Sequence, residues 1–244
     1  MKKELSLSLA TALLFSLFFT GCKKDASVAT ATSSQLSFDM LSDNASANLS
    51  AFTNNTGLAL NSTPLGTASV SWTTAIANVA KFKLDAKQGG TAFEVAANGL
   101  SNIDLFAITP ASISAVIPVG TYTGVELHVV LAKSTGTAFP LVLKGNYTTK
   151  AGNVVPIEFD FNEDLEIVAT ASDLVVDGKS DVLANISLHL NKLIANITTT
   201  DIDQTARTNS AILITGAINP TVYNKIKTDL QLSGGSNIVT TVRK

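Results

Sequence analysis

Cysteine, histidine and tryptophan are all scarce in this sequence. The 244 residues include one cysteine, two histidines and one tryptophan. A single cysteine cannot form an internal disulfide, so a hydrophobic core must hold the fold. A zinc site usually takes three or four Cys or His ligands at suitable spacing, so the two histidines are expected to lie on the surface. Charged residues make up only 15%, and the formal net charge is −2. This charge and the lack of a basic stripe argue against nucleic acid as a partner.

The only cysteine, Cys22, ends a segment that is typical of a bacterial lipoprotein signal. Lys2 and Lys3 give a basic start, residues 5–20 are mostly apolar, and Gly21 precedes the cysteine. This order predicts a signal peptide over residues 1–21 and acylation of Cys22. A transmembrane helix is the less favoured alternative because the stretch is marginal in length. A plain secretory signal would leave a free, reactive thiol at the new N-terminus.

The residue after the lipidation site indicates where the protein is anchored. Acyl chains on Cys22 would hold the protein firmly on a bilayer. Lys23 follows, not the Asp that commonly marks retention in the inner membrane. We therefore expect an outer-membrane lipoprotein, on either the cell surface or the periplasmic face.

Behind the anchor, the composition predicts a tether and one domain. Residues 22–35 are small and polar and are expected to form the lipidated cysteine and a flexible tether. Residues 36–244 are expected to form a single domain. Within it, residues 36–66 could begin with a strand or short helix and then read as a loop or weak strands. Whether they belong to the domain is left open.

From residue 67 onward, alternating apolar residues predict an all-β domain. Val125, Leu127, Val129 and Leu131 take one face of the clearest strand. Glycine, asparagine or proline separates the segments, which is typical of an antiparallel β-sandwich. The predicted strands cover residues 70–72, 79–84, 92–96, 103–108, 125–131, 139–147, 154–161, 165–169 and 182–190.

Two segments have apolar residues at helical spacing. The apolar residues of 182–197 fit both the two-residue period of a strand and the 3.6-residue period of a helix. β-Branched residues and perfect alternation up to Leu190 favour a strand. Asn219 as an N-cap, Pro220 at the first position and an apolar stripe predict one short C-terminal helix. It should end before Gly234-Gly235, which, like Gly89-Gly90, are interpreted as turn glycines.

The densest acidic cluster, residues 158–166, is a weak calcium candidate. Asp160, Asn162 and Asp164 match the opening of a calcium loop. Leu165 stands where the sharp turn needs glycine, and Ala171 where a bidentate Glu should close the site. A polar turn is therefore favoured, with no metal site.

The sequence contains no recognisable set of catalytic residues. Glu158, Asp160 or Glu163 with a histidine could in principle act in a hydrolase, but a catalytic pair needs convergent geometry that the sequence does not show. No glycine-rich phosphate loop or serine elbow is present, and no cofactor is expected.

Flat aromatic side chains would be needed for glycan binding. Trp72, Tyr122, Tyr147 and Tyr223 are the candidates, but they are widely separated in sequence. Trp72 lies beside Val70 ahead of apolar strands, which favours a place in the core.

Several motifs resemble those of a Bacteroidetes lipoprotein family with a β-sandwich domain of unknown function. They are residues 77–82, 103–106, 117–122 and 125–127, together with the lipidation motif and residues 219–223. The resemblance covers roughly residues 67–232. It implies exposure to the surface or periplasm and a transthyretin- or immunoglobulin-like architecture. It supplies no catalytic residues.

These observations together predict a non-enzymatic module anchored to the outer membrane by lipid. Its expected role is binding or structure, of the adhesin or surface-assembly type, in which an exposed edge strand accepts a strand from another chain. The alternative is a glycan-binding accessory lipoprotein of an outer-membrane uptake system. The partners are thus the membrane, through the anchor, and a protein or a glycan.

Overall fold

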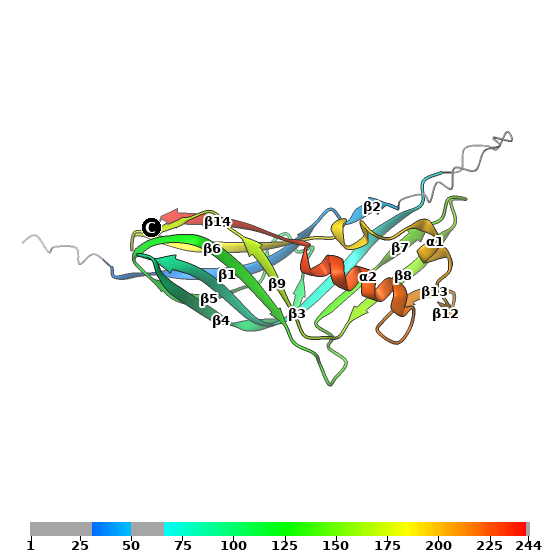
Figure 1. The fold of residues 1–244 in the computed structure, drawn as a ribbon, viewed down its shortest axis with the longest axis horizontal. Helices are drawn as coiled ribbons and strands as arrows, with labels where there is room; N and C mark the ends of the chain where they lie inside the picture. The colour runs from blue at the N-terminus through cyan, green and yellow to red at the C-terminus, as the bar shows by residue number, and fades with distance from the viewer. Residues whose placement is uncertain (1–30, 50–65, 243–244) are drawn as a thin grey trace, which may run out of the picture. The chain divides into compact units, whose positions relative to one another are not determined.

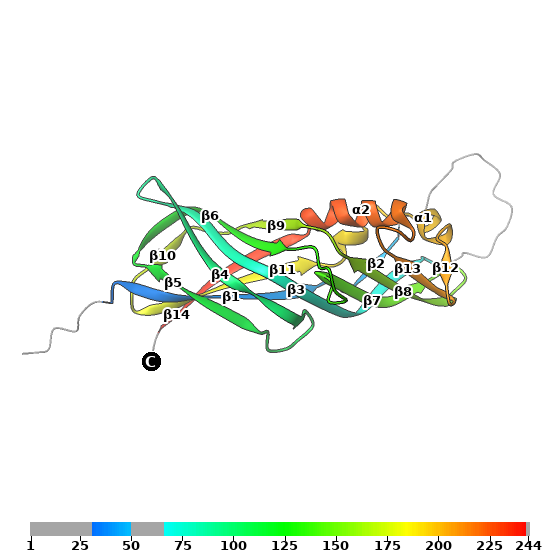
Figure 2. The ribbon, with the colours of Figure 1, turned by 90° about the horizontal axis from the view of Figure 1, so that it is seen from below.

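Strands account for most of the folded part of the chain (Figures 1 and 2). The computed structural model describes residues 31–49 and 66–242. The predicted signal peptide and Cys22 lie outside these described residues. The strands form a four-stranded and a ten-stranded sheet, so the predicted all-β class is confirmed. The sheets are mixed and not purely antiparallel, because β1 runs parallel to β11 and β13 runs parallel to β8.

The smaller sheet, sheet A, joins the beginning of the described chain to its end. Its order is β14-β11-β1-β5. The strands are β1 (Ser33–Asp43), β5 (Ser112–Pro118), β11 (Ser180–His189) and β14 (Gly234–Val242). Because β1 begins at Ser33, the last three residues of the expected tether belong to the sheet. Of the ambiguous residues 36–66, residues 36–43 are strand as well, and residues 50–65 lie outside the described residues.

The larger sheet, sheet B, is organised around β3. It has the order β10-β6-β3-β7-β8-β13-β12, and β2 and β4 pair with β3 while β9 pairs with β6. Its strands are β2 (Ser46–Asn48), β3 (Ser69–Gln88), β4 (Thr91–Asp104), β6 (Gly120–Leu131), β7 (Leu141–Thr148), β8 (Val154–Phe161), β9 (Leu165–Thr170), β10 (Leu174–Val176), β12 (Arg207–Thr208) and β13 (Ala211–Ile214).

The 20-residue strand β3 differs from the sequence prediction of two short paired strands. Its first half pairs with β7 and its second half with β6. Buried residues alternate up to Trp72 and resume at Ala75, and the register against β7 shifts between Trp72 and Thr74. A bulge adds one residue and so changes the phase of the alternation. That phase change made one strand look like two.

One hydrophobic core is shared by the two sheets. Phe38 of β1 and Phe82 of β3 are fully buried, and their rings stack with centroids 5.8 Å apart. The predicted hairpins around Gly89-Gly90 and around residues 150–153 are confirmed as β3–β4 and β7–β8. These local pairings bring the apolar faces of sheet B onto the core.

The predicted C-terminal helix is confirmed as α2 (Pro220–Gln231). Asn219 occupies the predicted N-cap position, but its side chain makes no capping hydrogen bond. This residue has a left-handed backbone (φ 58°), and its side chain bonds to the backbones of Ala206 and Leu213 instead. The sequence did not predict α1 (Thr199–Asp203) or the 3₁₀ turn Lys192–Ile194. None of the helices in residues 31–49 and 66–242 has the length and apolarity needed to cross a membrane.

The interpretation of Gly234-Gly235 as a simple turn was wrong, because these two glycines open strand β14. A Cβ on Gly235 would lie 2.5 Å from His189 Nε2. The second glycine thus lets β14 run close beside the histidine of β11. The strand expected over residues 182–190 is confirmed as β11.

Candidate functional site

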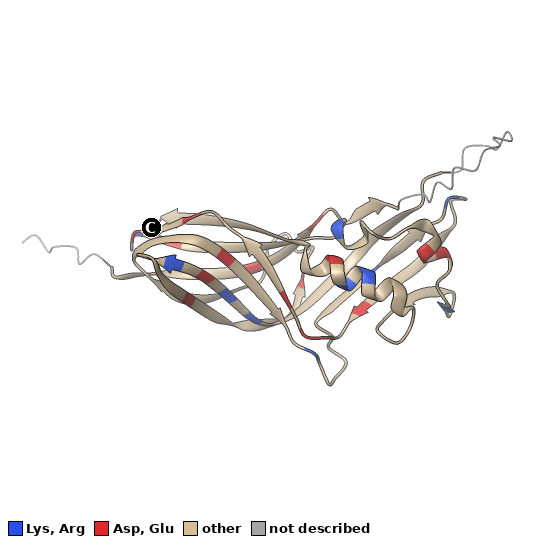
Figure 3. Ribbon diagram, in the orientation of Figure 1, with Lys and Arg blue, Asp and Glu red and all other residues tan. Residues whose placement is uncertain are grey.

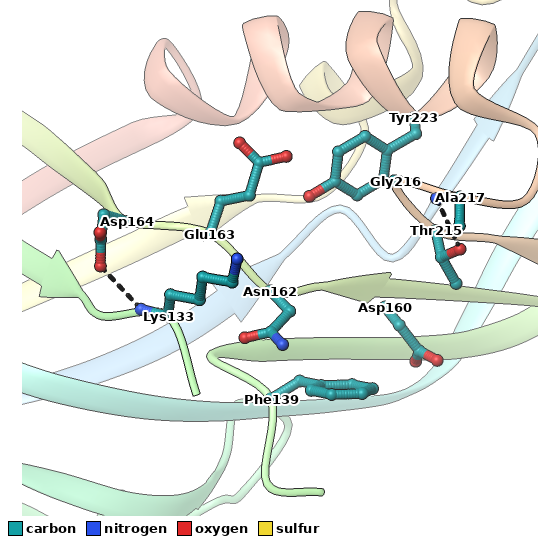
Figure 4. A pocket seen from close by; sticks show the side chains of 10 residues that line it. All are labelled: Lys133, Phe139, Asp160, Asn162, Glu163, Asp164, Thr215, Gly216, Ala217 and Tyr223. Carbon is teal, nitrogen blue, oxygen red and sulfur yellow. Dashed lines mark hydrogen bonds between the residues drawn. The ribbon is translucent and has the colours of Figure 1, made fainter. Parts of the chain in front are cut away.

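A cleft of about 790 Å³ contains the three residues of the weak calcium candidate (Figure 4). It lies at the end of β8 and is bordered by the segment after β6, the loop after β13 and helix α2. Its lining residues are Lys133, Phe139, Asp160, Asn162, Glu163, Asp164, Thr215, Gly216, Ala217 and Tyr223. The cleft therefore gathers three acidic residues of the 158–166 cluster, Asp160, Glu163 and Asp164.

Asn162 and Asp164 hold the backbone of the segment that follows β6. Asn162 Oδ1 accepts from the Ser134 N–H at 2.7 Å, and Asn162 Nδ2 donates to the Ser134 carbonyl at 3.0 Å. Asp164 Oδ1 accepts from the Lys133 N–H at 2.8 Å. Two of the three candidate calcium ligands thus have a structural role. In the described part of the chain, no group of three or more His, Cys, Asp or Glu is placed to hold a metal ion.

Asp160 is the least satisfied acid of the cleft. Its Oδ1 is buried without a hydrogen-bond partner. Burial, with a smaller contribution from neighbouring Glu158, raises the pKa of Asp160 to about 6. Glu158 itself pairs with Lys144 at 2.7 Å. The two carboxyl groups lie on the same face of β8, and the negative charge of Glu158 favours the protonated form of Asp160.

Glu163 is tied to helix α2. It pairs with Lys227 and also bonds to the hydroxyl of Tyr223. The hydrogen bond from Lys227 is the largest cause of the lowered pKa of Glu163. Figure 4 shows the Glu163 and Tyr223 side chains pointing toward each other. This acid therefore joins the helix to the end of β8.

Both histidines pair with carboxylates outside the cleft. His189 Nδ1 lies 2.7 Å from Asp43 Oδ1. His128 Nδ1 lies 2.9 Å from Glu166 Oε1, and His128 Nε2 lies 3.2 Å from Asp85 Oδ2. The hydrolase grouping of a histidine with Glu158, Asp160 or Glu163 is not assembled by these contacts.

The expectation of two solvated histidines was wrong for His128. This residue is only 7% exposed. It lies on β6, between β3 and β9. Lys83 of β3 and Glu166 of β9 form an ion pair, with Lys83 Nζ 3.0 Å from Glu166 Oε1, and these two side chains cover the histidine. A polar position on a central strand is covered by its neighbours even on the outer face of a sheet. The sequence showed the alternation but not the neighbours.

All four aromatic candidates for glycan binding are buried. Trp72 is 3% exposed, Tyr223 is 2% exposed, and Tyr122 and Tyr147 are fully buried. The prediction that Trp72 belongs to the core is confirmed. Tyr122 donates to the Pro118 carbonyl, and Tyr147 donates to Asp203. None of these rings offers a flat platform to a sugar, so the structural basis of the glycan alternative is lost.

Strand β14 offers a different kind of surface, an open sheet edge. It bonds to β11 on one side, and no other strand of residues 31–49 and 66–242 forms a ladder with its second side. The beginning of β14 lies against β9, where Ser236 Oγ donates to the Thr170 carbonyl at 2.6 Å, so the open part of the edge is its C-terminal half, residues 238–242. Val239 is 43% exposed and Val242 72% exposed. The strand contains no Lys, Arg, Asp or Glu (Figure 3).

The backbone groups at this edge can be assigned from one hydrogen bond. The His189 N–H donates to the Ser233 carbonyl, next to the β11–β14 ladder. In an antiparallel pair, the backbone N–H and C=O groups of successive residues point alternately toward and away from the neighbouring strand. Residues 235, 237, 239 and 241 therefore face β11. The N–H and C=O groups of Ile238, Thr240 and Val242 project toward the open side.

Other long edges of the two sheets carry protective features that β14 lacks. Edge strand β5 has seven residues and ends in Pro118. Strand β4 is longer, but it carries Glu94 and Asp104, and its register with β3 shifts between Ala77 and Val79. Charges, prolines and bulges are the usual means of blunting sheet edges. The unprotected β14 was missed in the sequence because its only signal is a short run of β-branched residues after two glycines.

Comparison with protein families, with curated proteins and with solved structures found no match to the chain. The resemblance to a Bacteroidetes lipoprotein family and the transthyretin- or immunoglobulin-like type of sandwich therefore stay predictions. Any function must be argued from the residues themselves.

Proposed function

We propose that this chain is a non-enzymatic lipoprotein of the outer membrane that binds a protein partner by adding a strand to the edge of β14. The observation that carries the proposal is the nine-residue edge strand without charge or proline. In strand addition, main-chain hydrogen bonds supply affinity and alternate side chains supply specificity. The outward N–H and C=O groups of Ile238, Thr240 and Val242 are the bonding groups such a partner needs.

The lipidation motif supports the membrane part of the proposal. Lys2 and Lys3, the apolar stretch and Gly21-Cys22 have the order of a lipoprotein signal. Strand β1 begins at Ser33, so residues 22–32 would connect the anchor to the domain. The strand-rich domain is then held close to the membrane with its edge available for a partner.

The other surface, the cleft beside α2, gives less support to a binding role. Most of its polar groups already have partners: Asn162 and Asp164 bond to backbone, and Glu163 bonds to Lys227 and Tyr223. The exception is Asp160 Oδ1. The bonded groups are already satisfied and gain little from a ligand. The cleft is better described as the junction that fixes α2 and the segment after β6.

The experiment is protease treatment of intact cells that express the full chain, together with metabolic acyl labelling. We expect wild-type protein to carry the acyl label and Cys22→Ser to lack it. We also expect protease to release the domain by cleavage between residues 22 and 32. An unlabelled wild-type protein would overturn the anchor. Cleavage only after permeabilisation of the outer membrane would assign the domain to the periplasmic face instead of the cell surface.

A further inference from the structure

The sequence of β14 is suited to pairing with itself. Two identical strands in antiparallel pairing are related by a two-fold axis, so residues on one side of the centre lie opposite residues on the other side. If the centre is Thr240, then Ile238 lies opposite Val242 of the second copy, and Val239 lies opposite Thr241. Each of these pairs joins a β-branched residue to another, which is a favourable cross-strand combination.

We propose that the partner of β14 is β14 of a second copy of this chain, paired antiparallel about Thr240. This inference rests on the proposed function, because it names the strand that the open edge accepts. The two four-stranded sheets A would then join into one continuous sheet of eight strands. An isologous contact of this kind closes on itself and yields a dimer.

The hydrogen-bonding groups of the edge fit this register. In the antiparallel pair, Thr240 lies opposite Thr240 of the second copy, and Ile238 lies opposite Val242 of the second copy. The N–H and C=O groups of all three residues project toward the open side, as deduced from the bond between His189 and Ser233. Every outward group in this stretch therefore finds a partner on the second copy.

Exposure of apolar side chains also favours this register. Ile238 and Val242 lie on the same face of β14 as Thr240, opposite Ala184, Ser180 and Val182 of β11 respectively. Val242 is 72% exposed. Pairing about Thr240 places it beside Ile238 of the second copy. Centring the pair on Val239 would instead put Val242 opposite Ser236, a poorer match.

Charge and anchoring favour a second copy over a different partner. Strand β14 has no charged residue, so two copies meet without opposing like charges. Anchoring both chains to one bilayer would raise their effective concentration. A modest contact between the two strand edges is then sufficient to form a dimer. Pairing of β14 with the other edge, β5, would form open chains of molecules, and Pro118 and the shorter strand disfavour it.

The register can be tested by disulfide formation in cells that express the full chain. Val239 and Thr241 face β11 with their backbone, so they form a close, non-hydrogen-bonded pair across the proposed interface. Chains carrying Val239→Cys and chains carrying Thr241→Cys are tagged differently and co-expressed. We expect a disulfide-linked heterodimer, with clearly less product from either variant alone. Predominant self-linking of Val239→Cys would overturn the register about Thr240.

Wild-type chains expressed alone separate failure of the anchor from failure of the dimer. If Cys22 is acylated, the wild-type protein has no thiol and gives no disulfide product. A disulfide through Cys22 would overturn the anchor and leave the edge contact to be judged from the engineered cysteines. Absence of any cross-link from residues 239 and 241, with Cys22 acylated, would overturn the dimer.

A proline at the edge gives a second test with a matched control. The Thr240 N–H points away from β11, so Thr240→Pro should leave the ladder within sheet A intact and block the second copy. By the same alternation, the Val119 N–H bonds to Thr32 and the Val116 N–H points away from β1. Val116→Pro therefore changes the opposite edge in the same way.

We expect chemical cross-linking of membranes to show dimers for wild type and for Val116→Pro, and only monomers for Thr240→Pro. Circular dichroism and thermal melting of the purified proteins check that both variants fold. A folded Thr240→Pro variant that still cross-links as a dimer would overturn the proposal. Ladders beyond the dimer that Val116→Pro removes would also overturn it, because they would show pairing of β14 with β5.

Discussion

Asn185 donates from Nδ2 to Asp39 Oδ1 at 2.7 Å, across 146 residues of sequence. The two residues are direct neighbours on the parallel strands β1 and β11. The same offset of 146 separates two further polar pairs, Gln35 with Asp181 and Asp43 with His189. Apolar alternation alone would tolerate a shift of two residues in the register. The polar pairs on the outer face are compatible with only one register of β1 against β11.

The first prediction concerns this polar pair. Asp39 is 3% exposed, and burial raises the pKa of its carboxyl group. Asn185→Ala removes the hydrogen bond that stabilises the charged form. We expect a loss of about 1–3 kcal/mol in the free energy of unfolding, which urea denaturation measures. The loss should be smaller in an Asp39→Asn background. An equal loss in both backgrounds would show that the two side chains are not coupled.

A control for this prediction lies on the same face. Ser37 Oγ and Ser114 Oγ are 2.9 Å apart in an exposed pair. Ser37→Ala should change the free energy of unfolding by no more than about 0.5 kcal/mol, because water replaces the lost bond. The comparison separates the buried pair from the exposed one.

The second prediction concerns the contact between the two sheets. Phe38 is fully buried, and its ring stacks on that of Phe82. Phe38→Ala should lower the free energy of unfolding by about 3–5 kcal/mol, because a cavity is left between the sheets. The exposed Val116→Ala is the control and should have little effect. If Phe38→Ala were as mild as the control, sheet A would not pack on sheet B through β1.

Features set by nearby residues could be predicted from the sequence. The hairpins at Gly89-Gly90 and at residues 150–153 follow from turn residues between alternating strands. Helix α2 follows from Pro220 and an apolar stripe. In each case the partners are close in sequence, so the local pattern contains the information.

Features set by distant residues could not be predicted. The parallel pairing of β1 with β11 joins residues that are 146 positions apart in the sequence, and no local signal specifies it. The burial of His128 depends on Lys83 and Glu166 on neighbouring strands. The structural use of Asn162 and Asp164 depends on the backbone at residues 133–134. Their spacing resembled a calcium loop because the same oxygen groups can accept from N–H donors.

The third prediction concerns a close approach of two backbones. A Cβ on Gly99 would lie 1.8 Å from the Val79 carbonyl oxygen, beside the irregularity between β3 and β4. Gly99→Ala must therefore push the strands apart. We expect a loss of about 1–3 kcal/mol in thermal or urea unfolding. Gly136→Ala is a matched control, because a Cβ there meets only Ser134 Oγ at 3.8 Å. Equal stability of the two variants would mean that β3 and β4 are not in contact at Gly99.

The fourth prediction concerns pH. The pKa of Asp160 is raised from 3.8 to about 6, chiefly by burial. The folded protein therefore binds more protons than the unfolded chain between these values, and its stability falls as the pH rises through them. Asp160→Asn mimics the protonated carboxyl and can still donate to Glu158. We expect it to stabilise the protein by about 1 kcal/mol above pH 6 and to have no effect near pH 4.

Asp177 provides the opposite case within the same chain. It accepts hydrogen bonds from the N–H groups of Lys179 and Ser180, which lower its pKa. A lowered pKa stabilises the fold at neutral pH, and this contribution is lost as the pH falls through the folded-state value. Asp177→Asn should therefore destabilise the protein at pH 7 and lose its effect in acid. Urea unfolding of both variants across pH 3–8 measures the two trends. If Asp160→Asn followed the trend of Asp177→Asn, burial would not control the ionisation of Asp160.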